Sequence, residues 1–183
     1  MKWSMSLKSS INSSKGVDHM PRLRELQLKD VEKMYEWMSD PEVTESLAIG
    51  RYPSSKEKIE DFIKSSWSDK NNVHFAIVTD NDEYAGTVSL KNINLIDRNA
   101  EYAIAIHKEF WGSDYARFAT EKIISYGFQK LNLNKIYLNV ISKNVRANKF
   151  YEKYGFIFEG TFKDHMFING EMIDLNWYCI FNK

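Results

Sequence analysis

The sequence predicts a mixed α/β domain with a mostly antiparallel sheet of about seven strands, one central parallel pair and about four flanking helices. Residues 73–79, 84–93 and 99–106 alternate apolar with polar side chains between turns rich in Asp and Asn, which is typical of an antiparallel meander. A helical segment at 114–130 lies between the last of these runs and the apolar run 135–141. The two strands of such a strand–helix–strand crossover are parallel, and the connection is right-handed.

The segment before the meander is expected to supply one strand and two helices. Residues 22–28 alternate leucines with charged residues, which predicts a strand, and Asp30 is a good N-cap for a helix that ends near Ser39. Pro41 ends this helix, because the residue before a proline avoids the α conformation. After a loop to Pro53, Ser54 and Ser55 can cap a second helix. Its apolar face consists of Ile59, Phe62, Ile63 and Trp67.

The segment after the crossover is expected to supply a helix and a hairpin. Residues 144–153 have helical spacing, and residues 156–181 alternate as two strands that turn at Asn169 and Gly170. Asn-Gly is favoured in a two-residue hairpin turn, because both residues there adopt positive φ. We expect a single domain over residues 21–183, preceded by a Ser-rich leader or tag at 1–20.

Composition excludes several classes of protein. The chain of 183 residues has 25 basic and 25 acidic side chains, so the positive charge of a general nucleic-acid binder is absent. No apolar run approaches the roughly 18 residues of a membrane span, so we expect no membrane association. The single cysteine, Cys179, allows no internal disulfide, and the four histidines are scattered, so we expect a cytoplasmic protein without a metal site.

One run of residues carries a specific functional signal. Residues Asn144 to Phe156 follow the pattern Asn-x-x-Ala-x-x-x-Tyr-Glu-Lys-x-Gly-Phe, which resembles the second acetyl-CoA motif of the GNAT N-acetyltransferase superfamily. The order of predicted elements over 21–181 also resembles that family, and is most similar to the branch of spermidine, Rim-type protein N-terminal and amino-sugar-nucleotide acetyltransferases. The resemblance implies acetyl-CoA as cosubstrate and direct attack by a primary amine in a ternary complex.

The turn at 111–116 is a candidate anion site. It joins a strand to the start of a helix, where backbone N–H groups and the helix dipole favour negative charge; an ordinary turn is the alternative. The resemblance implies that this loop holds the pyrophosphate, although Trp111 and Asp114 depart from the family pattern. The residues expected to bind acetyl-CoA are Ala105, Ile106, His107, Trp111, Gly112, Ser113, Asp114, Tyr115, Ala116, Arg117, Asn144 and Ala147.

Two residues are candidates for catalysis. Tyr151 matches the family tyrosine that protonates the departing thiolate, and the alternative is that it only packs against the sheet. Glu101 shares a strand face with Ala103 and Ala105, which predicts an acid beside a cleft. A protonated amine must lose a proton before it attacks, so Glu101 is a candidate base, acting directly or through water. The alternative is a surface acid paired with Arg98 or a lysine.

The sequence leaves the acceptor amine open. Acids near the first helices and the last hairpin would suit a polyamine, whereas basic residues there would suit the phosphates of an amino-sugar nucleotide. The acids are Glu42, Glu45, Glu159, Asp164, Glu171 and Asp174, and the basic residues are Arg22, Arg51 and Lys163. A peptide N-terminus as acceptor and a homodimer are also compatible. The functional alternative is an acyl-CoA-binding module that has lost catalysis, which the departures at Trp111 and Asp114 motivate.

Overall fold

A computed structural model describes residues 21–44 and 55–183 of the chain. Seven strands form one sheet in the order β1-β2-β3-β4-β5-β7-β6, in which β4 and β5 are parallel and the other neighbours antiparallel. The strands are β1 (Arg22–Glu25), β2 (Val73–Val78), β3 (Tyr84–Asn94), β4 (Asn99–Ile106), β5 (Lys135–Ile141), β6 (Ile157–Ile168) and β7 (Glu171–Phe181). The helices of the described part are α1 (Val31–Met38), α2 (Pro41–Thr44), α3 (Lys56–Ser66), α4 (Tyr115–Gln129) and α5 (Val145–Lys153), with 3-10 turns η1 (Leu28–Asp30) and η2 (Lys108–Phe110). The predicted fold class is confirmed.

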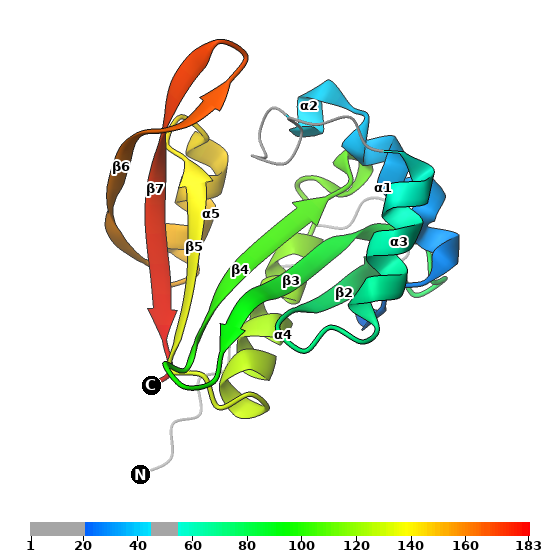
Figure 1. Cartoon of the computed structure of the whole chain (residues 1–183), viewed down its shortest axis with the longest axis horizontal. Coiled ribbons are helices and arrows are strands. Elements are labelled where there is room, and N and C mark those ends of the chain that lie inside the picture. Colours follow the sequence, from blue (N-terminus) through cyan, green and yellow to red (C-terminus); the bar gives the residue numbers. More distant parts are fainter. Residues whose placement is uncertain (1–20, 45–54) are drawn as a thin grey trace, which may run out of the picture.

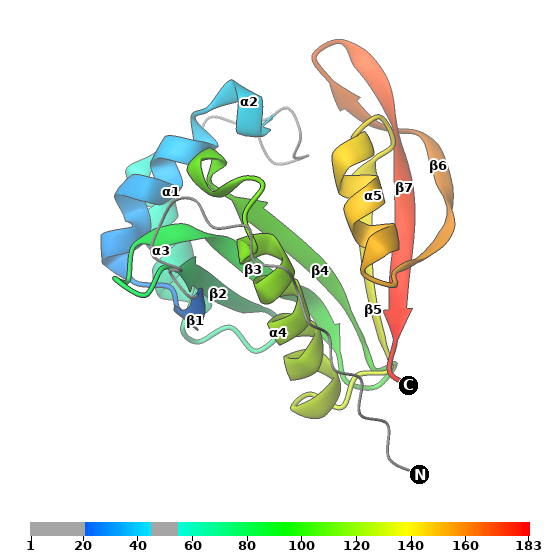
Figure 2. The ribbon, with the colours of Figure 1, turned by 180° about the vertical axis from the view of Figure 1, so that it is seen from behind.

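Helices cover both faces of the sheet (Figure 1). On one face, α1 and α3 bury Trp37 and Ile63 in a cluster with residues of β2 and β3. On the other face, α4 and α5 bury Ile123 and Tyr151 in a second cluster with β3, β4 and β5 (Figure 2). Each large apolar side chain buried in this way contributes about 1.5–3 kcal/mol. The strands in the middle of the sheet are therefore fixed from both sides.

The parallel pair β4–β5 is short. Residues 99–101 of β4 pair with residues 135–137 of β5, and the ladder ends there. β4 continues to Ile106 on β3 alone, while β5 continues to Ile141 on β7 alone. The two halves of the sheet diverge toward the C-terminal ends of these strands (Figure 1). One edge of each strand is therefore left without a partner strand.

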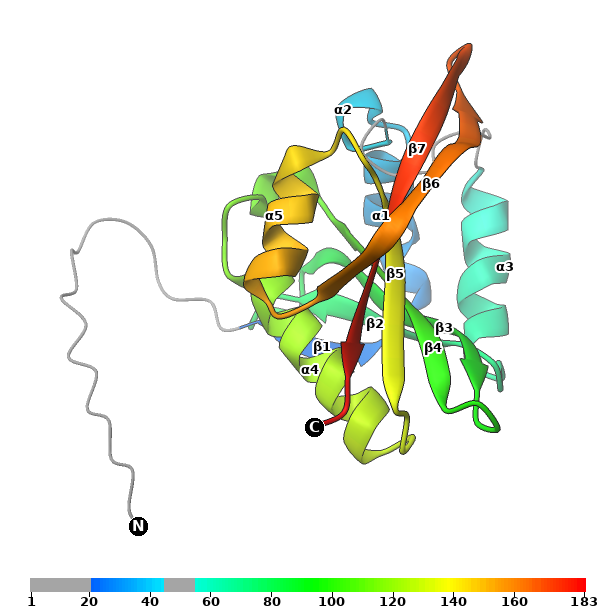
Figure 3. The same cartoon turned by 90° about the vertical axis from the view of Figure 1, so that its left-hand side faces the viewer.

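β6 and β7 form a long hairpin that extends past α5 (Figure 3). Its turn residues, Asn169 and Gly170, have φ values of 50° and 85°, as the Asn-Gly pair predicts. β7 pairs with β5 on one side and β6 on the other, so β6 is the edge strand of this half. The tip of the hairpin lies at the end of the molecule where the sheet opens (Figure 1).

The beginning of the domain differs from the predicted elements in two places. β1 is shorter than expected, and Asp30 does not cap α1 with its side chain. Its buried carboxylate instead accepts two hydrogen bonds from the Arg24 guanidinium, both at 2.7 Å. Pro41 begins the short helix α2 where a loop was expected, and the Asp40 carboxylate accepts a hydrogen bond from the Glu42 N–H at 3.0 Å.

Two predicted segments, the leader at 1–20 and residues 45–54 of the loop, lie outside the described residues. The predicted cap of α3 is confirmed, because the Ser55 side chain accepts a hydrogen bond from the Lys58 N–H at 3.3 Å. Among the helices described, none is long and apolar enough to cross a membrane.

Candidate active site

A cavity of about 390 Å³, called the gap cavity below, lies beside the diverging edge of β4. Its walls come from β4, the loop between η2 and α4, and α5. Most of the predicted site residues line it: Ala105, Ile106, Trp111, Gly112, Ser113, Asp114, Ala116, Arg117, Asn144, Ala147 and Tyr151. The predicted residues Glu101, His107 and Tyr115 do not.

Strand pairing decides which backbone groups of β4 face the gap cavity. The His107 N–H donates to the Ala85 carbonyl at 2.8 Å, so every second residue back along β4 directs its N–H and C=O groups toward β3. The intervening residues Ile104 and Ile106 direct theirs toward the gap. The Ile106 carbonyl accepts a hydrogen bond from Trp111 Nε1 at 2.9 Å. The backbone N–H and C=O of Ile104 and the N–H of Ile106 therefore face the gap cavity and are available to a ligand there.

This pairing supports only part of the predicted β4 contacts. The backbone groups of Ala105 point toward β3, although the residue is among those that line the cavity. The buried His107 ring lies 3.8 Å from the Glu36 carboxylate of α1 and 3.5 Å from the Glu109 carboxylate. The strand pairing therefore does not support backbone contacts from Ala105 and His107, and Ile104 is a residue that the sequence reasoning missed.

The loop before α4 presents backbone groups to the gap cavity. Gly112 has a φ of +77°, and no atom lies within 4 Å of the position that a Cβ would take, so the glycine leaves open space beside the loop. The N–H groups of Ala116 and Arg117 belong to the first turn of α4 and have no acceptor among the described residues. Together with the helix dipole, they form a site suited to an anion.

The Asp114 carboxylate is solvent-exposed and paired. Its side chain is 75% exposed, and its oxygens lie 3.1 Å from Nε and 3.0 Å from Nη2 of Arg117. Arg117 lowers the pKa of Asp114, and the carboxylate makes no cap on α4. Asp114, which departs from the family pattern, therefore adds a negative charge to the loop that Arg117 neutralises.

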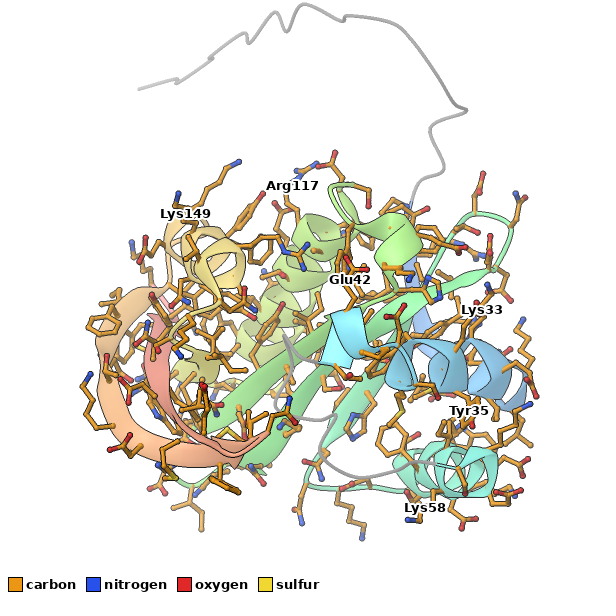
Figure 4. All side chains as sticks on the ribbon, turned by 90° about the horizontal axis from the view of Figure 1, so that it is seen from above. Lys33, Tyr35, Glu42, Lys58, Arg117 and Lys149 are labelled. Carbon is orange, nitrogen blue, oxygen red and sulfur yellow. The ribbon has the colours of Figure 1, made fainter. Side chains whose placement is uncertain are left out.

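Basic side chains surround the predicted anion site. Arg117, Arg146 and Lys153 all line the gap cavity. The Arg146 guanidinium stacks over the Trp111 indole, with its central carbon 4.1 Å from the ring centre. Arg117 lies on the α4 and α5 side of the molecule, opposite Lys58 on α3 (Figure 4). Arg117 on α4 and the α5 side chains Arg146 and Lys153 thus place positive charge on two walls of the gap cavity.

Tyr151 lies on α5 with its ring among aromatic side chains. The ring centres of Tyr102, Phe150 and Phe156 are 6.1, 5.5 and 5.5 Å away. Burial raises the pKa of the Tyr151 phenol above its usual value. Its hydroxyl has no hydrogen-bond partner among the described residues. A protonated O–H is therefore available to a ligand in the gap cavity.

Sequence reasoning missed Asn148, which holds α5 in place. Its amide nitrogen donates to the carbonyls of Asn144 and Ile141 at 2.7 and 3.2 Å. Its amide oxygen accepts from Asn176 Nδ2 at 2.8 Å and from the Tyr178 hydroxyl at 2.9 Å. An asparagine on the buried side of a helix was the available signal, but its partners on β7 lie far away in the sequence.

A second cavity, of about 360 Å³, lies between α1, α3 and strands β2–β4 and is called the helix cavity below. Ala103 and Ala105 line it, as the alternation of β4 predicts. Ile104 and Ala105 line both cavities, so the two cavities meet at β4. Its other lining residues are Met34, Trp37, Met38, Lys58, Ile59, Phe62, His74, Thr87, Ser89 and Lys91.

Glu101 lines neither cavity. It lies in the paired part of β4, and its carboxylate accepts hydrogen bonds from Lys91 Nζ at 2.9 Å and from Asn92 Nδ2 at 3.0 Å. The ion pair with a lysine is one of the alternatives that the sequence left open. The role of Glu101 as a base stays a prediction.

Of the described acids that would suit a polyamine, none lines either cavity. Glu45 and Arg51 are outside the described residues, and the remaining candidates line neither cavity. Several of the acids pair with lysines: Glu42 with Lys108 at 4.0 Å, Glu159 with Lys135 at 2.7 Å, Glu171 with Lys143 at 3.5 Å, and Asp174 with Lys163 at 2.7 Å.

Neither a metal-ligand cluster nor a reactive thiol is present among the described residues. Within the described ranges, no group of His, Cys, Asp and Glu side chains is placed to hold a metal ion. Cys179 is buried and lines neither cavity, and burial together with Glu159 raises its pKa to about 11. A protonated, enclosed thiol of this kind is a structural residue.

Comparisons with known proteins agree on one family. The model of the GNAT acetyltransferase domain matches residues 22–157. The spermidine N(1)-acetyltransferase of Escherichia coli K12 is 32% identical over 163 residues, or 89% of this chain and 87% of the relative. An uncharacterised N-acetyltransferase of Bacillus licheniformis, p20, is 29% identical over 164 residues, or 88% of this chain and 92% of the relative.

A solved structure gives the same result. The spermidine N-acetyltransferase of Vibrio cholerae, in complex with CoA and spermine, matches with a TM-score of 0.82 at 30% identity, covering 88% of this chain and 95% of that chain. Another structure of that enzyme is described as dodecameric. The matched region includes β4, the loop before α4 and α5, which build the gap cavity. The chain therefore belongs to the GNAT family and is an acetyl-CoA-dependent N-acetyltransferase that acetylates an amine.

Proposed function

We propose that the gap cavity binds acetyl-CoA and that the helix cavity receives a primary amine, which attacks the acetyl thioester directly. The observation that carries this proposal is the meeting of the two cavities at Ile104 and Ala105. A thioester held along the β4 edge and an amine in the helix cavity approach each other at these residues. Direct attack in such a ternary complex involves no covalent intermediate on the enzyme.

The residues of the gap cavity fit the parts of acetyl-CoA. The Ala116 and Arg117 N–H groups at the start of α4, with the Arg146 and Lys153 side chains, suit the pyrophosphate. The Ile104 groups and the Ile106 N–H suit the pantetheine amides and the thioester carbonyl. A backbone N–H aimed at that carbonyl stabilises the negative charge that develops on its oxygen during attack.

The opposite wall supplies further contacts and a proton. Asn144 and Ala147, at the start of α5, hold the pantetheine from the side facing β4. Acetyl-CoA supplies the acetyl group, and CoA leaves as the thiol. Tyr151 donates its phenolic proton to the thiolate, and its raised pKa keeps that proton on the phenol until the sulfur departs.

For the acceptor we favour a compact primary amine with an apolar body. Most of the wall of the helix cavity is apolar, and the charged side chains that line its described part are Lys58 and Lys91. A polyamine has several positive charges, and among the described residues no carboxylate lines the helix cavity to pair with them. The spermidine acetyltransferases among the relatives support a polyamine as the second candidate.

Thiol release from acetyl-CoA tests the proposed function. The purified chain is assayed with phenylethylamine, an aliphatic monoamine, spermidine, glucosamine and a peptide with a free N-terminus. We expect the monoamines to have a higher kcat/KM than spermidine. A preference for spermidine supports the second candidate. If none of these amines causes thiol release while calorimetry shows that CoA binds, the result supports the acyl-CoA-binding module instead.

We also infer that the chain self-associates through the hairpin of β6 and β7. Phe162, Phe167 and Met172 are 49%, 62% and 51% exposed on this hairpin, and β6 is an edge strand. Exposed apolar side chains on an edge strand favour pairing with another chain. The dodecameric relative supports this inference.

A further inference from the structure

We propose that the His74–Ser89 pair in the floor of the helix cavity accepts the proton that the acceptor amine must lose, a proposal that rests on the function proposed above. An alkyl amine has a pKa near that of lysine, about 10.4, so it enters a neutral solution as an ammonium ion. The ammonium nitrogen has no lone pair with which to attack. A base that faces the helix cavity is therefore required.

Strand register places the pair beside the acceptor. His74 on β2 lies opposite Ser89 on β3, which lies opposite Ala103 on β4. His74 Nδ1 and Ser89 Oγ are 2.8 Å apart, and all three residues line the helix cavity. Ala105, where the two cavities meet, is two residues farther along β4, or about 7 Å. An amine at Ala105 therefore reaches Ser89 through water in the helix cavity.

The other titratable groups near the helix cavity are poorly suited to the role. Lys58 and Lys91 also line the cavity, but the lysine ammonium group is a hydrogen-bond donor with no acceptor site. Both carboxylate oxygens of Glu101 are occupied, by Lys91 and by Asn92, and Glu101 does not line the cavity. Of the residues described along the cavity wall, His74 is the one with an unprotonated nitrogen at neutral pH.

The surroundings of His74 keep its imidazole neutral. Burial is the main cause that lowers the His74 pKa, and Lys91 on β3 acts in the same direction. Asp69, in the loop after α3, opposes them. From α3, Phe62 places its ring 4.9 Å from the imidazole and Lys58 adds a positive charge to the cavity wall. The net effect is an imidazole in its neutral form, with one ring nitrogen that can accept a hydrogen bond from Ser89.

The proton transfer balances in simple steps. In the neutral imidazole with its hydrogen on Nε2, Nδ1 accepts the Ser89 hydroxyl proton while Ser89 Oγ takes a proton from the ammonium through water. The products are a free amine and an imidazolium, which returns its proton to solvent after turnover. The second nitrogen-bound proton, lost as the amide forms, balances the proton that Tyr151 gives to the thiolate.

The pH dependence of kcat tests this assignment with saturating acetyl-CoA and amine between about pH 6 and 9. The kcat of the wild type is expected to rise with pH and to level off near neutral pH. His74→Gln is expected to lose about 10²-fold near pH 6–7 and to approach wild type at high pH, where the amine deprotonates unaided. Ser89→Ala should show a smaller loss with the same pH shape. The control is His165→Ala, an exposed histidine on β6, which should behave as wild type.

Chemical rescue separates a proton acceptor from a structural residue. Imidazole added to His74→Ala is expected to restore part of the lost kcat, because it occupies the deleted ring position. The proposal is overturned if each variant, His74→Gln and Ser89→Ala, loses kcat by the same factor at every pH and imidazole does not rescue His74→Ala. If His74→Gln does not bind CoA or melts early, Ser89→Ala decides by its pH shape alone. Absence of thiol release in wild type overturns the proposed function instead, so the two failures are distinguishable.

Discussion

The Arg146 guanidinium lies over the indole of Trp111, with its central carbon 4.1 Å from the ring centre. Arg146 is in the first turn of α5 and Trp111 is in the loop before α4, so this contact joins two walls of the gap cavity. The indole is held on its other side by the hydrogen bond from Nε1 to the Ile106 carbonyl at 2.9 Å. Trp111, which departs from the family pattern, therefore positions a cation that faces the proposed pyrophosphate site.

We expect Arg146→Ala to raise the KM for acetyl-CoA by about 10-fold with little change in kcat, because a charge-assisted contact to phosphate is worth about 1.5–3 kcal/mol. Arg146→Lys should recover only part of the loss, since an ammonium cannot form the planar stack on Trp111. The matched control is Lys149→Ala, which removes the same charge from α5 at a residue that does not line the cavity (Figure 4). Equal effects of Arg146→Ala and Lys149→Ala would point to the general electrostatic field rather than to a specific contact.

Tyr151→Phe is expected to lower kcat by about 10²–10⁴-fold, the usual contribution of a general acid, while CoA binding by calorimetry stays unchanged. Because burial raises the Tyr151 pKa above about 10, wild-type kcat should not decline on the alkaline side up to that pH. Tyr154→Phe, at the C-cap of the same helix and lining the same cavity, is the control and should retain its kcat. An unchanged kcat in Tyr151→Phe would assign the ring to packing.

The elements predicted well are those whose signal is local. Ser55 caps α3 and the Asn169-Gly170 pair forms the turn of the last hairpin, because cap and turn geometry depend on a few neighbouring residues. Tyr151 and the loop residues were found together because each lies in a short contiguous motif. Asp30 is the N-cap residue of α1 as predicted, but its carboxylate accepts hydrogen bonds from Arg24 and the Gln27 N–H instead of from α1.

The helix cavity could not be predicted, because distant segments build it. Met34, Phe62, His74 and Ser89 come from α1, α3, β2 and β3, and each shows an ordinary core or surface pattern in its own segment. The divergence of β4 from β5 after residue 101 has no local signal either. Strand alternation and the resemblance to the family therefore predicted Glu101 as the base, whereas the residues that line the helix cavity together are recognised only from the sheet register.

Asp114→Asn tests whether the exposed ion pair influences the anion site. Removing the carboxylate leaves Arg117 free to face the phosphates, so we expect CoA to bind about 2–5-fold more tightly at low salt, the size of an exposed charge interaction. The gain should shrink at high salt, because charges are screened over about 8–10 Å at ordinary ionic strength. Glu121→Gln removes an equal charge 3.6 Å from Arg117 one turn later and should have a smaller effect. A tightening well above 10-fold that persists in salt would place the Asp114 carboxylate against the phosphates.

Phe167→Lys tests self-association. The side chain is 62% exposed on the edge strand, so a charge there should leave the fold intact and oppose burial against another copy. Light scattering after gel filtration should show an oligomer for wild type and a smaller species for the variant. Lys163→Ala, also exposed on β6, is the control. A monomeric wild type would contradict the inferred interface.

Glu101→Gln decides between the base that strand alternation predicts and the base that faces the helix cavity. Glutamine keeps the contact to Asn92 but loses the ion pair with Lys91, which lies at 2.9 Å. Since the carboxylate lines neither cavity, we expect a loss in kcat of less than about 10-fold, by the same factor at every pH from about 6 to 9. A base would behave differently: its removal costs most at low pH, where the amine is protonated, and little near the pKa of the amine. A loss of that second form in Glu101→Gln, with a flat profile in His74→Gln, would restore Glu101 as the base and remove His74 from the mechanism.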